Sequence, residues 1–116
     1  NLERSLTLAS FLEGHIVQGH VDARARVSEI KKDGATRNIT IVVPRDLRKF
    51  IAPQGSITIN GVSLTVSRVD ENQVIVALIP YTIAHTNLGL LTSNDEVNIE
   101  VDLLARYSLN YATQTI

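Results

Sequence analysis

The chain has 116 residues, a formal net charge of −1 and 44% hydrophobic residues, which suffices for one domain with a hydrophobic core and is too short for two. The sequence has no large block of Lys and Arg, which argues against a nucleic-acid partner. It also has no run of about eighteen apolar residues, so a membrane-spanning helix is not expected. There is no cysteine, which excludes disulfides, thiolate nucleophiles and zinc–thiolate sites and fits a reducing compartment.

The first part of the chain predicts two strands and a helical turn. Residues 17–27 alternate between small or apolar side chains at odd positions and polar ones at even positions, which indicates a half-buried strand. The Asp33-Gly34 pair predicts a hairpin turn. Residues 39–43 form a second expected strand, ended by a proline, and residues 45–51 suggest a short helical turn.

The middle of the chain contains an Asn60-Gly61 pair inside a strand-like stretch. Apolar residues occupy odd positions before this pair and even positions after it, so one straight strand over residues 56–69 is excluded because its core face would switch. Two options remain open. One is a two-residue hairpin turn that pairs Ile59 with Val62, and the other is a bulge or bend in one long strand.

The last part of the chain predicts two more strands. Residues 73–79 are nearly all apolar and β-branched, which indicates a buried strand stopped by Pro80. Residues 82–91 suggest a short helix ending near a glycine. Residues 97–101 alternate as a last strand, and residues 103–111 have apolar side chains at helical spacing.

About six short strands separated by turns are typical of an all-β barrel or sandwich. A closed six-stranded antiparallel barrel is the simplest arrangement that protects the edges of so small a sheet. The chain opens with the residues NLE and repeats a similar NIE at residues 98–100. Together with a start at Asn1 rather than Met, this echo predicts the second half of a tandem repeat.

The segment GHIVQGH contains two candidate histidines, His15 and His20, five residues apart. A helical metal-binding pair has i, i+4 spacing, the neighbouring glycines favour a strand, and no third ligand is evident, so no metal site is expected. Two interpretations remain. The histidines bond to backbone or water at the start of a strand, or Gly19 lets a ligand approach the backbone beside His20.

Two further features have both a structural and a functional interpretation. Ser63 and Thr65 lie opposite the core in either option for the Asn-Gly pair, as solvent-facing hydroxyls on a strand or as ligand contacts. At residues 77–82 (ALIPYT) a strand ends at Pro80. That end is a simple termination, or it exposes backbone groups near Ile79 that hydrogen-bond the edge of a flat heterocycle.

Taken together, four motifs resemble the C-terminal half of riboflavin synthase: GHIVQGHVD, GSITINGVSLTV, LIPYTIAHTNLG and VNIEVDLLARY. The resemblance implies a six-stranded antiparallel Greek-key barrel with short helices and a remnant of a C-terminal helix. It implies one lumazine-binding domain over residues 1–116, with its core at about 14–102, as the second half of a tandem-barrel protein. In the family the first half carries a cysteine where this chain has Ser63, which marks the chain as the second half.

The resemblance also implies a transferase reaction without cofactor or metal. Two molecules of 6,7-dimethyl-8-ribityllumazine react, and a four-carbon unit passes from one to the other to give riboflavin and 5-amino-6-ribitylamino-pyrimidinedione. The implied partners are the N-terminal barrel of another subunit in a cytoplasmic homotrimer, so the isolated domain is expected to be inactive or weakly active. The alternative is a non-catalytic, antenna-type protein that binds lumazine or flavin.

Carried over by position, the resemblance implies a substrate-binding set and a catalytic set. His20 is the candidate base with Asp102 as its helper, and Ser63 is the third candidate catalytic residue. Gln54 stands where many relatives have lysine, so a charged contact of the family is missing at this position. The substrate-binding set comprises Gly19, His20, Val21, Gln54, Ser63, Leu64, Thr65, Ala77, Leu78, Ile79, Pro80, Tyr81 and Thr82.

Overall fold

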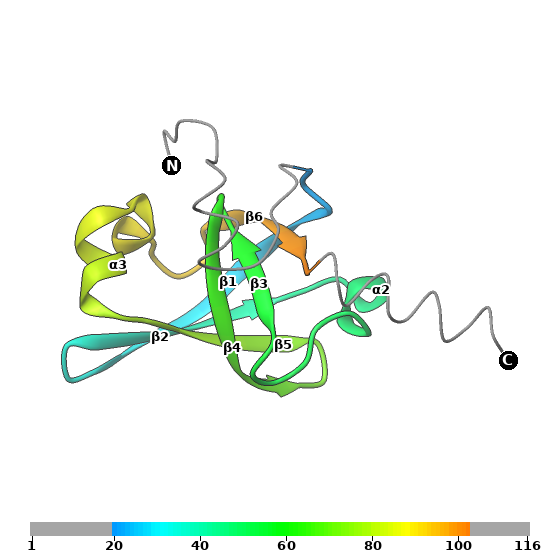
Figure 1. Cartoon of the computed structure of the whole chain (residues 1–116), viewed down its shortest axis with the longest axis horizontal. Helices are drawn as coiled ribbons and strands as arrows, with labels where there is room; N and C mark the ends of the chain where they lie inside the picture. Colours follow the sequence, from blue (N-terminus) through cyan, green and yellow to red (C-terminus); the bar gives the residue numbers. More distant parts are fainter. Residues whose placement is uncertain (1–19, 103–116) are drawn as a thin grey trace, which may run out of the picture.

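In the computed structural model, which describes residues 20–102, six strands close into an antiparallel barrel (Figure 1). The order of the strands around the barrel is β1-β2-β5-β4-β3-β6, and the predicted fold class is confirmed. The strands are β1 (Ala23–Asp33), β2 (Thr36–Val42), β3 (Ser56–Ile59), β4 (Val62–Asp70), β5 (Gln73–Leu78) and β6 (Glu96–Val101).

Three short helices lie in the two longest connections. Helix α2 (Arg45–Arg48) joins β2 to β3, while α3 (Pro80–His85) and the 3₁₀ helix η1 (Asn87–Leu90) join β5 to β6. Because β3, β4 and β5 are consecutive neighbours and β2 lies beside β5, strands β2 to β5 have the Greek-key order. Figure 1 shows α2 and α3 on opposite sides of the barrel. Among the residues described, none of the helices has the length and apolar character that crossing a bilayer requires.

The core fills the barrel with one face of each strand. Each strand contributes alternate residues, because successive side chains point to opposite faces, and α2 and η1 add one leucine each. The buried apolar side chains are Ala25, Val27, Ile39, Ile41, Val43, Leu47, Ile51, Ile57, Ile59, Leu64, Val66, Val74, Val76, Leu78, Leu88, Val97, Ile99 and Val101.

The Asn60-Gly61 pair forms a two-residue hairpin turn between β3 and β4. Both residues have positive φ, 49° and 84°, as a type I′ turn requires, and Ile59 pairs with Val62 across it. The hairpin option is therefore confirmed over a bend in one strand. The turn is also tied to β6, since the Asn60 N–H donates to the Asn98 carbonyl (2.9 Å) and the Asn98 N–H donates to Asn60 Oδ1 (2.8 Å).

Two predicted boundaries are wrong. Strand β1 begins at Ala23 and continues to Asp33, whereas alternation placed it over residues 17–27, and Val21, expected on the core face, is 55% exposed. The sequence pattern did not predict the second half of β1, because there the strand pairs with β2 in a hairpin whose two faces both carry polar side chains. The residues of the expected helix 103–111 lie outside the described part of the chain.

The single helix expected over residues 82–91 is also wrong, because the segment forms two helices. Helix α3 begins earlier, at Pro80, since proline is favoured in the first turn, where its missing N–H costs nothing. The chain leaves the helix at Thr86, whose side chain accepts a hydrogen bond from the Leu88 N–H at 3.2 Å and caps η1.

Replacing Gly89 with alanine is expected to destabilise the fold by about 1–3 kcal/mol, as overpacking a close contact does. A Cβ at this position would clash with the carbonyl oxygen of Ile83, whereas one at Gly34 would meet nothing within 4 Å. The measurement is urea unfolding of Gly89→Ala beside Gly34→Ala. Because Gly34 has a φ of 62°, its variant measures the cost of left-handed backbone strain alone, about 1–2 kcal/mol, and a Gly89→Ala protein as stable as the wild type would contradict the steric account.

Candidate functional site

Strands β4 and β5 diverge at one end of their ladder and form a fork on the outer surface of the barrel. Their pairing begins at Val66 and Val76 and runs to the turn that joins them. The earlier part of β4, Val62–Thr65, pairs with β3, and the end of β5, Ala77–Leu78, pairs with β2. Figure 1 shows β4 rising away from β5, which continues to α3. The name β4–β5 fork is used for Val62–Thr65 on β4 together with Ala77–Tyr81, where β5 ends and leads into α3.

The β4 side of the fork presents two hydroxyl groups to the outside. Ser63 and Thr65 are exposed, while Leu64 between them is 8% exposed and belongs to the core. Across the ladder, Ser63 pairs with Thr58 and Thr65 with Ser56. The expected outward position of both hydroxyls is confirmed, whereas the Leu64 side chain points into the core and its backbone faces its partner Ile57 on β3.

The β5 side of the fork presents apolar and aromatic side chains. Ala77 is half-buried and Leu78 is fully buried in the core. Beyond them, Ile79 and Tyr81 are 55% and 68% exposed. The Tyr81 ring stacks on the His85 ring with centroids 4.1 Å apart. The fork is therefore polar along β4 and apolar where β5 leads into α3, which suits an amphipathic heterocycle.

Backbone carbonyls at the end of β5, which the sequence suggested as ligand contacts, accept hydrogen bonds within helix α3. The Ile79 carbonyl accepts from the Ile83 N–H at 3.1 Å, and Nδ1 of His85 lies 2.8 Å from the Tyr81 carbonyl. Thr82 follows the same pattern, because its carbonyl accepts from the N–H and the hydroxyl of Thr86. Recognition at this segment therefore falls to side chains and N–H groups more than to carbonyls.

Gln54 reaches β4 from the connection between α2 and β3. Its N–H donates to the Val66 carbonyl and the Val66 N–H donates to the Gly55 carbonyl, both at 2.8 Å. These bonds place Gln54 beside Val66 of β4, the residue that follows Thr65. Gln54 is exposed and has a φ of 70°, a left-handed conformation that is uncommon outside glycine and that the sequence did not reveal.

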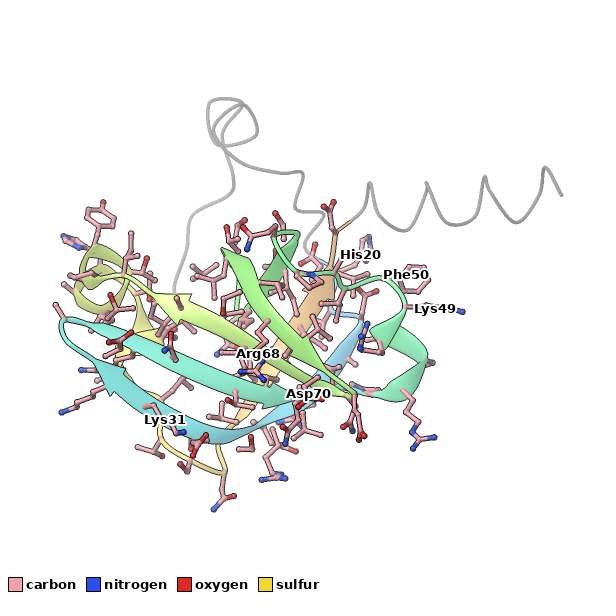
Figure 2. All side chains as sticks on the ribbon, turned by 90° about the horizontal axis from the view of Figure 1, so that it is seen from below. His20, Lys31, Lys49, Phe50, Arg68 and Asp70 are labelled. Atoms are coloured by element: carbon pink, nitrogen blue, oxygen red, sulfur yellow. The ribbon has the colours of Figure 1, made fainter. Side chains whose placement is uncertain are left out.

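His20 and Asp102 flank the same end of the barrel. His20 is exposed just before β1, and Asp102 is half-buried just after β6. The segment after His20 is held to β6 by a 2.9 Å bond from the Asp22 N–H to the Ile99 carbonyl. In the view of Figure 2, His20 lies on the side of the barrel that carries Phe50 and Lys49, away from Lys31 on β1. The predicted Gly19 lies outside the described residues.

The strand pairing separates Ser63 from Asp102, two of the three candidate catalytic residues. Thr58 on β3 is flanked by Ser63 on β4 and Glu100 on β6, so Ser63 and the strand that leads to Asp102 are two strand spacings apart. That separation is roughly 10 Å. Ser63 therefore belongs to the fork, whereas Asp102 and His20 belong to the neighbouring end of β6 and β1.

The sequence did not single out a cleft between α2 and the β4–β5 turn. It has a volume of about 470 Å³ and is lined by Arg45, Arg48, Glu71 and Asn72. The Arg48 guanidinium donates to the carbonyls of Glu71 and Ile51 and so fixes α2 to the turn. The only signal in the sequence is the i, i+3 spacing of the two arginines on a short helix. Over residues 20–102, no group of three or more His, Asp or Glu side chains is placed to hold a metal ion.

Comparison with known proteins finds one family and a set of related chains. Residues 18–102 match the family model described as "Lumazine binding domain". The chain is 44% identical to "Riboflavin synthase" of Brucella abortus (strain 2308), over 97% of this chain and 55% of that protein. It is 41% identical to "Riboflavin synthase" of Photobacterium leiognathi, over 92% of this chain and 49% of that protein.

Solved structures agree with this relationship. LumP complexed with flavin mononucleotide matches with a TM-score of 0.71 and 27% identity, over 74% of this chain and 49% of that chain. LumP complexed with 6,7-dimethyl-8-(1'-D-ribityl) lumazine matches with a TM-score of 0.70 and 25% identity, over 76% of this chain and 49% of that chain. The chain spans about half the length of the curated relatives it matches, and, by its sequence and its barrel, it belongs to the lumazine binding domain family.

Proposed function

We propose that the chain binds 6,7-dimethyl-8-ribityllumazine and riboflavin as the C-terminal lumazine-binding half of a riboflavin synthase. The observation that carries this proposal is the match of residues 18–102 to the family model. The barrel adds an outer-surface fork with hydroxyls on one strand and apolar side chains on the other. Riboflavin synthases that are about twice as long as the matched region support the tandem architecture.

In this proposal the fork holds one lumazine. Ser63 and Thr65 hydrogen-bond its ring, and Gln54 reaches the ribityl hydroxyls from the adjoining connection. The exposed side chains of Ile79 and Tyr81 cover its apolar face. Hydroxyl and amide groups are uncharged and hydrogen-bond neutral polar ligands. Gln54 can therefore hydrogen-bond the ribityl chain although it lacks the charge of the lysine found in many relatives.

The reaction requires a second lumazine, which the N-terminal barrel of another subunit supplies in a proposed cytoplasmic homotrimer. The two bound lumazines exchange a four-carbon unit and give riboflavin and 5-amino-6-ribitylamino-pyrimidinedione. Holding both rings face to face supplies proximity, which accounts for a large part of the rate enhancement in such reactions. His20 acts as the base for the acidic 7-methyl group with Asp102 beside it, and Ser63 contacts the reacting ring.

A second candidate function is a non-catalytic, antenna-type lumazine- or flavin-binding protein. The structural similarity to LumP, solved in complex with lumazine and with flavin mononucleotide, supports this second candidate. The synthase is preferred because this chain is 35–44% identical to riboflavin synthases and 25–27% identical to LumP. Both functions use the same fork, so binding alone does not distinguish them.

The test combines a titration with a mixing assay. Equilibrium fluorescence titration of the chain with 6,7-dimethyl-8-ribityllumazine and with riboflavin measures binding. The chain is then mixed with the N-terminal half of a riboflavin synthase, and riboflavin formation from the lumazine is followed against each half alone. Binding with turnover in the mixture supports the synthase, binding without turnover supports the antenna function, and the absence of binding overturns both.

A further inference from the structure

Strand β6 closes the barrel, and its last residue donates a hydrogen bond to the carboxylate of Asp22, the residue just before β1. β6 pairs with β1 on one side and β3 on the other. The backbone pairing of β1 and β6 runs from Arg26 and Glu96 to Ala23 and Ile99. Beyond it, the Val101 N–H donates to Oδ2 of Asp22 at 2.8 Å. A side-chain oxygen thus continues the ladder where the backbone pairing stops.

The two bonds of Asp22 fasten one short stretch of chain to the end of β6. Its N–H donates to the Ile99 carbonyl at 2.9 Å, and its carboxylate accepts from Val101. Val101 is 6% exposed and pairs with Ile57 on β3, so the acceptor is attached to the rigid wall of the barrel. Hydrogen bonds to an ionised carboxylate are stronger than those between neutral groups, and Asp22 is half-buried.

Asp22 stands between the two groups that the proposed chemistry needs at this end. His20 is two residues before it, outside any strand and exposed, and Asp102 directly follows the residue that Asp22 binds. Val21, the residue between His20 and Asp22, is 55% exposed and so gives that segment little apolar anchoring. The carboxylate of Asp22 is therefore one of the attachments that hold the segment after His20 against the end of β6, next to Asp102.

We propose that Asp22 is a positioning residue, which holds the His20 segment against the end of β6 and so sets His20 beside Asp102. The expected effect of Asp22 on ligand binding rests on the proposed function. The attachment itself is a property of the free chain and is testable without ligand. Asp22 acts through His20 and is not assigned a contact with substrate.

The test compares Asp22→Ala with Asp22→Asn, which keeps an acceptor oxygen, and with Asp95→Ala as a matched control. Asp95 Oδ2 accepts from the Thr92 N–H at 2.8 Å, so it is a similar carboxylate–backbone bond at the other end of β6. Backbone ¹⁵N relaxation of the His20 and Val21 amides in the free chain measures how firmly the segment is held. Fluorescence titration with 6,7-dimethyl-8-ribityllumazine measures the consequence.

We expect Asp22→Ala to mobilise the His20 and Val21 amides and to weaken lumazine binding about tenfold, the loss expected for one charge-assisted hydrogen bond. Asp22→Asn is expected to keep both properties largely intact, and Asp95→Ala to lower the melting temperature without changing either. Should Asp22→Ala fail to fold, Asp22→Glu, which displaces the carboxylate by one methylene, gives the same comparison.

The outcomes separate this inference from the proposed function. If the wild-type chain binds no lumazine, the proposed function falls, and the amide mobility alone decides the role of Asp22. Rigid His20 and Val21 amides in Asp22→Ala would overturn the inference, whatever the melting temperature. Mobile amides with unchanged lumazine affinity would also overturn it, because His20 would then not need to be positioned for the ligand.

Discussion

Replacing Ser63 and Thr65 together by alanine is expected to weaken lumazine binding about thirtyfold, while the melting temperature changes little. Both residues are exposed on the outer face of β4, and substitutions at such positions usually change stability by no more than about 0.5 kcal/mol. Two lost hydrogen bonds to a ligand cost about 2 kcal/mol together, which corresponds to that factor in affinity. Fluorescence titration and thermal unfolding of the same preparation measure the two quantities.

Ser67→Ala is the matched control for this double variant. Ser67 is another exposed serine on β4, and its hydroxyl donates to the Ile75 carbonyl at 2.9 Å. It lies at the irregularity between Val66 and Arg68 within the β4–β5 ladder rather than in the fork. The Ser67 variant is therefore expected to bind lumazine as the wild type does. Equal losses of affinity from both variants, or a loss of stability that matches the loss of binding in the double variant, would count against a site in the fork.

The orientation of the β4 hydroxyls was predictable because it follows from local alternation. Core-facing residues change phase at Asn60-Gly61, and only a turn or bend permits that change. The hairpin was one of the two remaining options, and the positive φ values of both residues show which one the chain uses. The outward position of Ser63 and Thr65 then needs no knowledge of the rest of the barrel.

The fork itself was not predictable, because it depends on where a ladder between two strands stops. β4 and β5 are joined by a two-residue turn, so the sequence suggests a hairpin paired along its whole length. In the barrel the pairing of β4 with β5 ends at Val66 and Val76, although β4 remains paired with β3 and β5 with β2 beyond these residues. Long-range pairing of this kind has no signature in hydrophobic periodicity.

The relation between the candidate catalytic residues was likewise hidden. Ser63 and Asp102 are far apart in the sequence, and only the pairing of both β4 and β6 with β3 sets their distance. The sequence did not predict the hydrogen bond of Asp22 for the same reason, because its partner Val101 is 79 residues away. An aspartate on the polar face of a strand looks like a solvated charge until its partner strand is known.

Replacing Ile99 by alanine is expected to lower the free energy of unfolding by about 2–5 kcal/mol, the range for removing a large aliphatic side chain from a packed core. Ile99 is fully buried on the strand that closes the barrel, and it pairs with Ala23 on β1 and Ile59 on β3. A cavity there removes contacts with both neighbours at once. Urea unfolding, with its midpoint and slope, gives the loss directly.

Ile79→Ala is the matched control for the Ile99 variant, since it deletes the same atoms from a side chain that is 55% exposed. A stability change within about 0.5 kcal/mol is expected there, together with weaker lumazine binding, because Ile79 covers the ligand in the proposed site. The two isoleucines thus separate the two uses of the barrel: its interior carries the stability, and its outer surface at the fork carries the binding. A large loss of stability from Ile79→Ala, or a small one from Ile99→Ala, would contradict that division.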